Sequence, residues 1–124
     1  MPHRVLIVSG DDAGRSATLR VLIDAGYEAL GAGTFEDAKR LLASEPPDLL
    51  IADERLGAFN GLHLVVRGHA THPHMRAIVT TSAKDSILES DAKQLDAECI
   101  VKPADPMGWL VPISQTLELA ALAS

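Results

Sequence analysis

Short apolar runs alternate along the chain with longer segments in which apolar residues recur every three or four positions. The short runs have the length of buried strands, and the longer segments have the spacing of helices that bury one face. We predict strands at residues 5–8, 28–32, 49–52, 77–81 and 98–101, each followed by a helix. Parallel strands joined by right-handed crossovers form a sheet that is covered on both faces, so this repeat predicts an α/β fold.

The predicted helices have recognisable ends. Gly26 follows the first helical segment and is a typical stop signal. Thr34 begins the second segment with the pattern of a capping box, and Pro46 ends it. Asp105, which is followed by proline, begins the last helix, and Pro112 is expected to kink that helix. The other two helices are predicted from residue 61 onward and over residues 84–95.

Polar side chains follow four of the predicted strands. In an open parallel sheet, the functional site lies beyond the carboxyl ends of the strands. Carboxylates, a hydroxyl and an ammonium are therefore expected to meet at one edge of the sheet. The residues are Asp11 and Asp12 after the first strand, Asp53 at the end of the third, Ser82 after the fourth and Lys102 after the fifth.

Composition and charge narrow the class of protein. The 124 residues, of which 47% are hydrophobic, fit one folded domain over residues 1–124. The net charge of −6 argues against binding to nucleic acid or to an anionic membrane surface. No apolar run approaches the length of about 20 residues that crosses a bilayer, and the N-terminus lacks the features of a secretory signal. The single cysteine, Cys99, excludes an intramolecular disulfide, so we expect a cytoplasmic protein.

Three segments at the strand ends resemble those of receiver domains in two-component response regulators, in particular the single-domain regulator of chemotaxis. They are DLLIADERLGAFNG at residues 48–61, TSA at 81–83 and VKP at 101–103, and the pair GY at 26–27 also fits. The resemblance implies a flavodoxin-like (βα)5 fold, a doubly wound parallel sheet with strand order 2-1-3-4-5. It also implies that the chain acts alone or as a fragment of a longer regulator or hybrid kinase.

By this resemblance, the chain is a signalling switch and not an enzyme, with at most a slow loss of its own phosphoryl group. Asp53 would accept that group from a sensor histidine kinase or a phosphotransfer protein. Lys102 would offset the negative charge that gathers when two anions meet. Ser82 would donate a hydrogen bond to a phosphoryl oxygen and move inward, with Thr80 and Thr81 as the alternatives.

The resemblance also implies Mg²⁺ as a cofactor, because this hard cation prefers oxygen ligands. In the family, an acidic pair directly follows the first strand, whereas Ser9 and Gly10 occupy those positions here. Either Gly10 adopts a positive φ and returns Asp11 to the metal, or the site binds Mg²⁺ weakly. The predicted metal ligands are Asp11, Asp12, Asp53 and the backbone carbonyl of Arg55.

Other features of the family pattern concern signal output. The family implies a cis bond between Lys102 and Pro103, and an output partner at a face made by residues 84–119. Cys99 stands where the family commonly has an aromatic residue that changes position, and Gly57 stands where it commonly has proline. The usual coupling between that aromatic residue and the hydroxyl at the site is therefore not expected.

Two other functions are weighed against the phosphoacceptor. If Ser9 and Gly10 abolish the metal site, the chain becomes a phosphorylation-independent receiver-like interaction module with a degenerate Mg²⁺ site. An aspartyl phosphohydrolase is disfavoured, because such enzymes carry D-x-D after the first strand and the segment SGDD lacks it.

Overall fold

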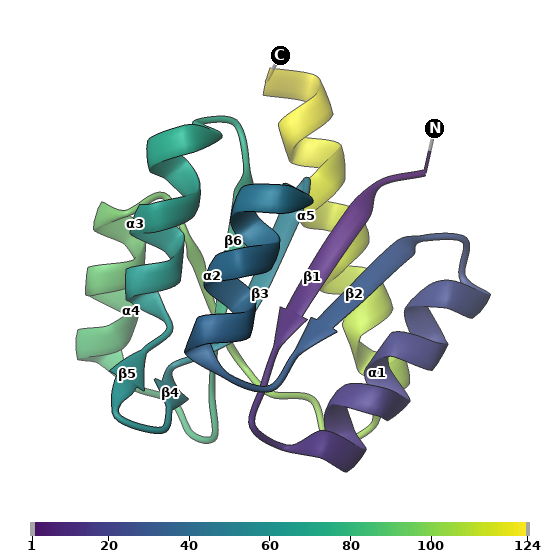
Figure 1. The fold of residues 1–124 in the computed structure, drawn as a ribbon, viewed down its shortest axis with the longest axis horizontal. Coiled ribbons are helices and arrows are strands. Elements are labelled where there is room, and N and C mark those ends of the chain that lie inside the picture. Colours follow the sequence, from purple (N-terminus) through teal and green to yellow (C-terminus); the bar gives the residue numbers. More distant parts are fainter. Residues whose placement is uncertain (1, 124) are drawn as a thin grey trace.

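Five parallel strands form the centre of the molecule in the computed structural model, which describes residues 2–123 (Figure 1). The strand order β2-β1-β3-β6-β7 is the predicted order 2-1-3-4-5 once the strands of this sheet are counted along the chain. The flavodoxin-like fold class is therefore confirmed. The strands are β1 (Arg4–Val8), β2 (Glu28–Ala32), β3 (Leu49–Asp53), β6 (Arg76–Thr81) and β7 (Glu98–Val101).

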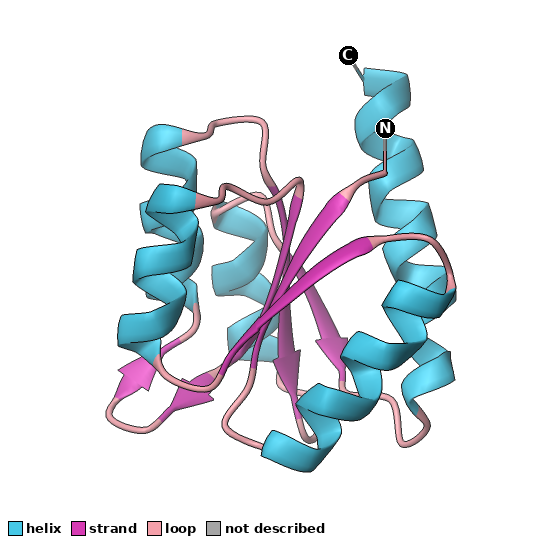
Figure 2. Cartoon of the chain, turned by 45° about the vertical axis from the view of Figure 1, so that its right-hand side comes forward, coloured by secondary structure: helices cyan, strands magenta, loops and turns pink. Residues whose placement is uncertain are grey.

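Helices cover both faces of this sheet, as Figure 2 shows from the side. One face is covered by α2 (Phe35–Ser44), α3 (Leu62–Thr71) and α4 (Ser86–Gln94). The other face is covered by α1 (Asp12–Asp24), the 3₁₀ turn η1 (Pro106–Trp109) and α5 (Leu110–Ala123). No helix among residues 2–123 has both the length and the apolarity needed to cross a membrane.

Alternating side chains of the central strands supply two separate cores. Leu6 and Leu50 pack under α2, α3 and α4, whereas Ile7 and Ile51 pack on the opposite face with Ile113 of α5. Successive residues of a strand point to opposite faces, so a strand buried on both sides must be apolar throughout. This requirement explains why the strands are continuous apolar runs in the sequence.

Most predicted helix ends agree with the structure. The Thr34 hydroxyl accepts a hydrogen bond from the backbone N–H of Asp37 at 3.2 Å, as a capping residue does. The last helix differs from the prediction, because Asp105 caps the separate turn η1 and α5 begins at Leu110. Pro112 therefore lies in the first turn of α5, where backbone N–H groups have no partner within the helix.

A small hairpin between β3 and α3 was not expected from the sequence. It consists of β4 (Arg55–Leu56) and β5 (Phe59–Asn60), which pair antiparallel around a turn with Gly57 at φ +62°. The Phe59 ring stacks on Phe35 at the start of α2, with 4.5 Å between ring centroids. Strands of two residues are too short to produce an alternating pattern, so periodicity does not reveal them.

We predict that Leu50→Ala lowers the free energy of unfolding by about 2–5 kcal/mol, because it leaves a cavity in a packed core. Leu50 is fully buried, whereas Ile87 of α4 is 74% exposed and provides the matched control. Ile87→Ala should change stability by no more than about 0.5 kcal/mol. Chemical denaturation followed by circular dichroism measures both values, and similar losses in the two variants would contradict this assignment of the core.

Candidate functional site

Asp53 is the last residue of β3 and lies at the carboxyl edge of the sheet. Its register partner on β6 is Thr80, a buried residue whose hydroxyl donates a hydrogen bond to Oδ1 of Asp53 at 2.7 Å. The Asp53 side chain is 19% exposed, so this carboxylate is largely removed from water but still reaches a pocket. The neighbouring strand therefore fixes the orientation of the carboxylate.

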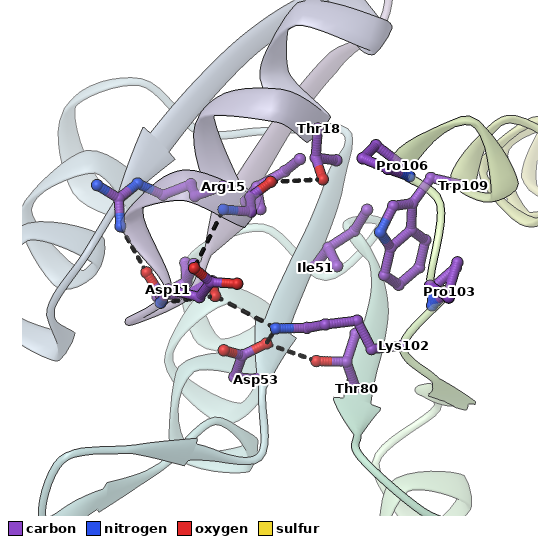
Figure 3. A pocket seen from close by; sticks show the side chains of 15 residues that line it. Asp11, Arg15, Thr18, Ile51, Asp53, Thr80, Lys102, Pro103, Pro106 and Trp109 are labelled. Carbon is purple, nitrogen blue, oxygen red and sulfur yellow. Dashed lines mark hydrogen bonds and ion pairs between the residues drawn. The ribbon is translucent and has the colours of Figure 1, made fainter.

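Lys102 directly follows β7 and brings a positive charge to Asp53 (Figure 3). Its Nζ lies 3.0 Å from Oδ1 of Asp53 and donates to the Ser9 hydroxyl at 3.3 Å. Its backbone N–H donates to the carbonyl of Thr81 at 2.9 Å, which continues the pairing of β7 with β6. The described residues contain no cis peptide bond, so the expected cis bond between Lys102 and Pro103 is wrong, and that bond is trans.

The two acids predicted as metal ligands after β1 differ in their surroundings. Asp11 caps α1, because its carboxylate accepts a hydrogen bond from the Gly14 N–H at 3.1 Å, and it lines the same pocket as Asp53. Asp12 is 85% exposed and pairs with Arg15 at 2.8 Å. The structure therefore brings Asp11, but not Asp12, to the pocket that contains Asp53.

Of the two alternatives for the segment after β1, the reversal of the backbone at Gly10 is not observed. The glycines with positive φ within residues 2–123 are Gly26 and Gly57, so Gly10 lies outside the left-handed region. Asp11 follows in an extended conformation with φ −84° and ψ 97°. The chain thus runs directly from β1 into the cap of α1, and Asp11 reaches the pocket without a reversal at Gly10.

The residues present do not fit the predicted magnesium site. Over the described part of the chain, no three or more Asp, Glu, His or Cys side chains are grouped so that they could hold a metal ion. Asp11 lines the pocket with Asp53 but caps a helix, and Asp12 faces Arg15, so the three predicted acids do not meet at one point. Arg55, whose carbonyl was the fourth predicted ligand, is exposed at the start of β4 and lines the outer pocket.

The hydroxyl in contact with Asp53 belongs to Thr80 and not to Ser82. Ser82 is exposed and lies at the rim of the pocket, while the Thr81 hydroxyl donates to the carbonyl of Ala83 at 2.9 Å. Ser82 was expected from the resemblance of the segment TSA at residues 81–83, with Thr80 and Thr81 as alternatives. The register of β3 with β6 places Thr80 there, and register depends on the pairing of two distant segments.

Arg15 is a residue near the site that the sequence did not indicate. Its guanidinium donates to the Ser9 carbonyl at 2.6 Å and pairs with Asp12, and its side chain is only 18% exposed. A Cβ at Gly33 would lie 2.9 Å from the Arg15 guanidinium, so the missing side chain at Gly33 makes room for it. The i,i+3 spacing of Asp12 and Arg15 on a predicted helix was a further signal in the sequence.

Two hollows meet at Asp53 and Lys102. An inner cavity of about 120 Å³ extends between α1 and η1, and Thr18 and the buried Trp109 are among the residues that line it. An outer pocket of about 530 Å³ opens to solvent, with Asp11 and Arg55 on its wall. Trp109 is the only tryptophan of the chain, so its fluorescence reports on the site.

Cys99 is half-buried on β7, three residues before Lys102. It packs against the core under α4, and its register partner is Val79. Burial raises the pKa of the Cys99 thiol, and the negative charges of Glu89, Asp85 and Glu54 raise it further. The thiol therefore stays protonated at neutral pH and serves as a small apolar side chain in this position.

With this geometry established, comparison with known proteins decides the family. The model of the response regulator receiver domain matches residues 5–109. This chain belongs to the response regulator receiver domain family. The family that the three strand-end segments suggested is thereby confirmed, and receiver domains are signalling switches that typically bind Mg²⁺.

Two curated relatives are response regulators longer than this chain. The chain is 33% identical over 89 residues to response regulator MprA of Mycolicibacterium vanbaalenii, which covers 72% of the chain and 38% of MprA. It is 30% identical over 112 residues to response regulator protein FleR of Pseudomonas aeruginosa, which covers 89% of the chain and 24% of FleR. The chain therefore spans less than half the length of either relative.

Solved structures show the same fold. The CheY-like response regulator receiver domain protein of Methanospirillum hungatei is 25% identical with a TM-score of 0.90, and 100% of each chain is covered. A response regulator described as putative in Chloroflexus aurantiacus is 26% identical with a TM-score of 0.82, over 95% of this chain and 99% of that one. The five-stranded receiver architecture thus extends over the whole described chain.

We predict that Gly61→Ala disturbs the site around Asp53, because a Cβ at Gly61 would clash with the backbone carbonyl of Asp53. Overpacking of this kind costs about 1–3 kcal/mol, and the shift should extend to the Asp53 side chain. Gly10→Ala is the matched control, since a Cβ there has no neighbour within 4 Å. Thermal denaturation and amide spectra of both variants test this. Equal effects of the two substitutions would show that the backbone at Gly61 does not approach the Asp53 carbonyl so closely.

Proposed function

We propose that this chain is a phosphoacceptor switch in which Asp53 receives a phosphoryl group from a histidine kinase or a phosphotransfer protein. The observation that supports the proposal is the carboxylate of Asp53 at the carboxyl edge of the sheet, in contact with the Thr80 hydroxyl and the Lys102 ammonium. Residues 1–124 would act as one receiver domain, either alone or as part of a longer regulator.

The contacts of Asp53 indicate which oxygen reacts. Thr80 and Lys102 both contact Oδ1, and no hydrogen bond or ion pair within residues 2–123 involves Oδ2. We therefore assign Oδ2 as the nucleophile that forms the new O–P bond while the P–N bond to the donor imidazole breaks. The Lys102 ammonium offsets the negative charge that accumulates as carboxylate and phosphoryl group approach.

The hydroxyl of Thr80 links this local charge change to the shape of the domain. In the unphosphorylated structure it donates to Oδ1 of Asp53, which becomes a much weaker acceptor once the carboxylate is esterified. The hydroxyl can then donate to a phosphoryl oxygen instead, and the segment after β6 would move with it. Such a change shifts the population of two states of the domain.

The proposed output surface is the face made by residues 84–119. Four large apolar side chains on it are exposed, at 48–74% of their full area: Ile87, Val101, Met107 and Val111. Exposed apolar side chains on neighbouring elements are typical of surfaces that bind other proteins. Response regulators act on output partners, and we place the partner of this chain here.

A second candidate function is a receiver-like interaction module that works without phosphorylation. The observation that favours it is the pair Ser9 and Gly10 in place of the family acids, together with the dispersed Asp11 and Asp12. In this case the face made by residues 84–119 would bind its partner without any change in the conformation of the domain.

The decisive experiment is incubation with acetyl phosphate and Mg²⁺, followed by intact mass measurement. We expect one added phosphoryl group in the natural chain and none in Asp53→Asn, which keeps the shape of the side chain but removes the nucleophilic charge. Asp12→Asn is the matched control, because Asp12 faces Arg15 at the surface and should still permit labelling. If the natural chain stays unlabelled with acetyl phosphate and with histidine kinases, the interaction module is the better description.

We also predict that Thr80, and not Ser82, couples phosphorylation to the conformational change. Thr80→Ala should abolish the shifts that phosphorylation causes in amide resonances of α4, because the hydroxyl next to Asp53 is gone. Thr80→Ser keeps a hydroxyl there and should restore the shifts, and Ser82→Ala should leave them unchanged. The opposite result, with loss of the shifts in Ser82→Ala alone, would assign the role to Ser82 as the sequence suggested.

A further inference from the structure

We propose that Lys102, positioned by Ser9, is the resident cation of the acceptor pocket, and that the missing carboxylates at positions 9 and 10 leave this receiver without a divalent-cation site. The inference refines the proposed function, since it concerns the cation that offsets charge at Asp53. Its first test is a binding measurement that requires no phosphorylation.

Ser9 is held by contacts on its N–H, its carbonyl and its hydroxyl. It is 4% exposed, and its N–H donates to the Ala32 carbonyl at 3.1 Å, which extends the pairing of β1 with β2. Its carbonyl accepts from the Arg15 guanidinium at 2.6 Å. Its hydroxyl accepts from the Asp11 N–H at 3.2 Å and from Lys102 Nζ at 3.3 Å. Ser9 is therefore fixed in place, and it gives the Lys102 ammonium a neutral oxygen.

Where the family pattern has an acid pair, Ser9 and Gly10 contribute no negative charge. Among the described residues, Asp53 is the one carboxylate paired with Lys102. The ammonium contacts the same oxygen, Oδ1, that Thr80 binds. A divalent ion at this carboxylate would have to displace the ammonium or share its ligand, without the added carboxylates that would offset the repulsion between two cations.

Asp11 does not replace the missing acids. Its carboxylate accepts the Gly14 N–H at the start of α1, and loss of such a cap costs about 0.5–2 kcal/mol. Glu54 also lines the outer pocket, yet the acids there do not form a three-ligand group within residues 2–123. Mg²⁺ requires nearly octahedral oxygen ligands at about 2.0–2.1 Å, which this arrangement does not supply.

Gly10 offers a direct way to test the inference. It is exposed, its φ is not positive, and a Cβ built on it has no neighbour within 4 Å. A side chain at this position therefore meets neither a clash nor backbone strain. If a carboxylate is what the pocket lacks, Gly10→Asp should create a divalent-cation site, and the neutral Gly10→Asn should not.

The experiment titrates Mg²⁺ at constant ionic strength and follows Trp109 fluorescence, with thermal denaturation as a second readout. Trp109 lines the cavity that also contains Asp53 and Lys102, and an ion that binds only the folded state raises the melting temperature. We expect no saturable response from the natural chain or from Gly10→Asn through the millimolar range. Gly10→Asp should give a saturable response that the additional change Asp53→Asn removes.

Two results of this titration would overturn the inference. A saturable response of the natural chain that Asp53→Asn abolishes would show that the pocket binds a divalent ion as it stands. A folded Gly10→Asp variant that gives no response would show that a carboxylate at this position is not what the pocket lacks. Circular dichroism of each variant establishes that it is folded.

The role of Ser9 has its own readout, the reactivity of the Lys102 amine. Ser9→Ala removes the oxygen that accepts from Lys102, so a limiting amine-acylating reagent should modify Lys102 several times faster in that variant. Lys84, which is exposed, is the internal control and should react at an unchanged rate. Ser9→Thr keeps a hydroxyl and should restore the slow reaction. An unchanged rate at Lys102 in Ser9→Ala would refute the positioning role.

Labelling by acetyl phosphate in the presence of a chelator separates this inference from the proposed function. Similar labelling of Asp53 with chelator and with Mg²⁺ supports Lys102 as the sufficient cation. Labelling that requires Mg²⁺ overturns the inference and leaves the phosphoacceptor function intact. No labelling under either condition counts against the phosphoacceptor function, and the Mg²⁺ titration then still decides the cation site.

Discussion

The ion pair between Lys102 and Asp53 is the interaction on which the arrangement of this site depends. Asp53 is mostly shielded from water, and a shielded carboxylate needs partners that compensate for its lost hydration. Those partners come from two other strands, Thr80 at the end of β6 and Lys102 after β7, and Ser9 after β1 contacts the ammonium. The site therefore exists only when four parallel strands end at the same edge of the sheet.

Two departures from the family pattern, Ser9 and Gly10, lie directly after β1, and Ser9 contacts the ammonium of that ion pair. Ser9 replaces an acid, Asp11 caps α1, and Asp12 pairs with an arginine that also binds the Ser9 carbonyl. These contacts give the side chains of Ser9, Asp11 and Asp12 partners within the protein. On the other side of the ion pair, Asp53 is held by the hydroxyl of Thr80.

The pairing of β6 with β7 connects the acceptor to the proposed output face. Thr80 pairs in register with Ile100, and the next pair, Thr81 with Val101, brings an exposed apolar side chain to that face. Cys99 precedes these residues on β7 as a small protonated thiol, so no large ring can swing between the site and the surface at this position. Under the proposed function, movement of the segment after β6 would pass to the output face through this pairing.

The sequence by itself determined the features that depend on local patterns. Apolar runs predicted the five parallel strands, Thr34 and Asp105 predicted helix caps, and the positions of Asp53 and Lys102 at strand ends predicted that they meet. Tertiary structure decided that Thr80 contacts Asp53, that Asp12 faces Arg15, and that Ser9 binds an amine 93 residues away. Strand register and side-chain direction arise from contacts between distant segments, and periodicity along one segment contains no information about them.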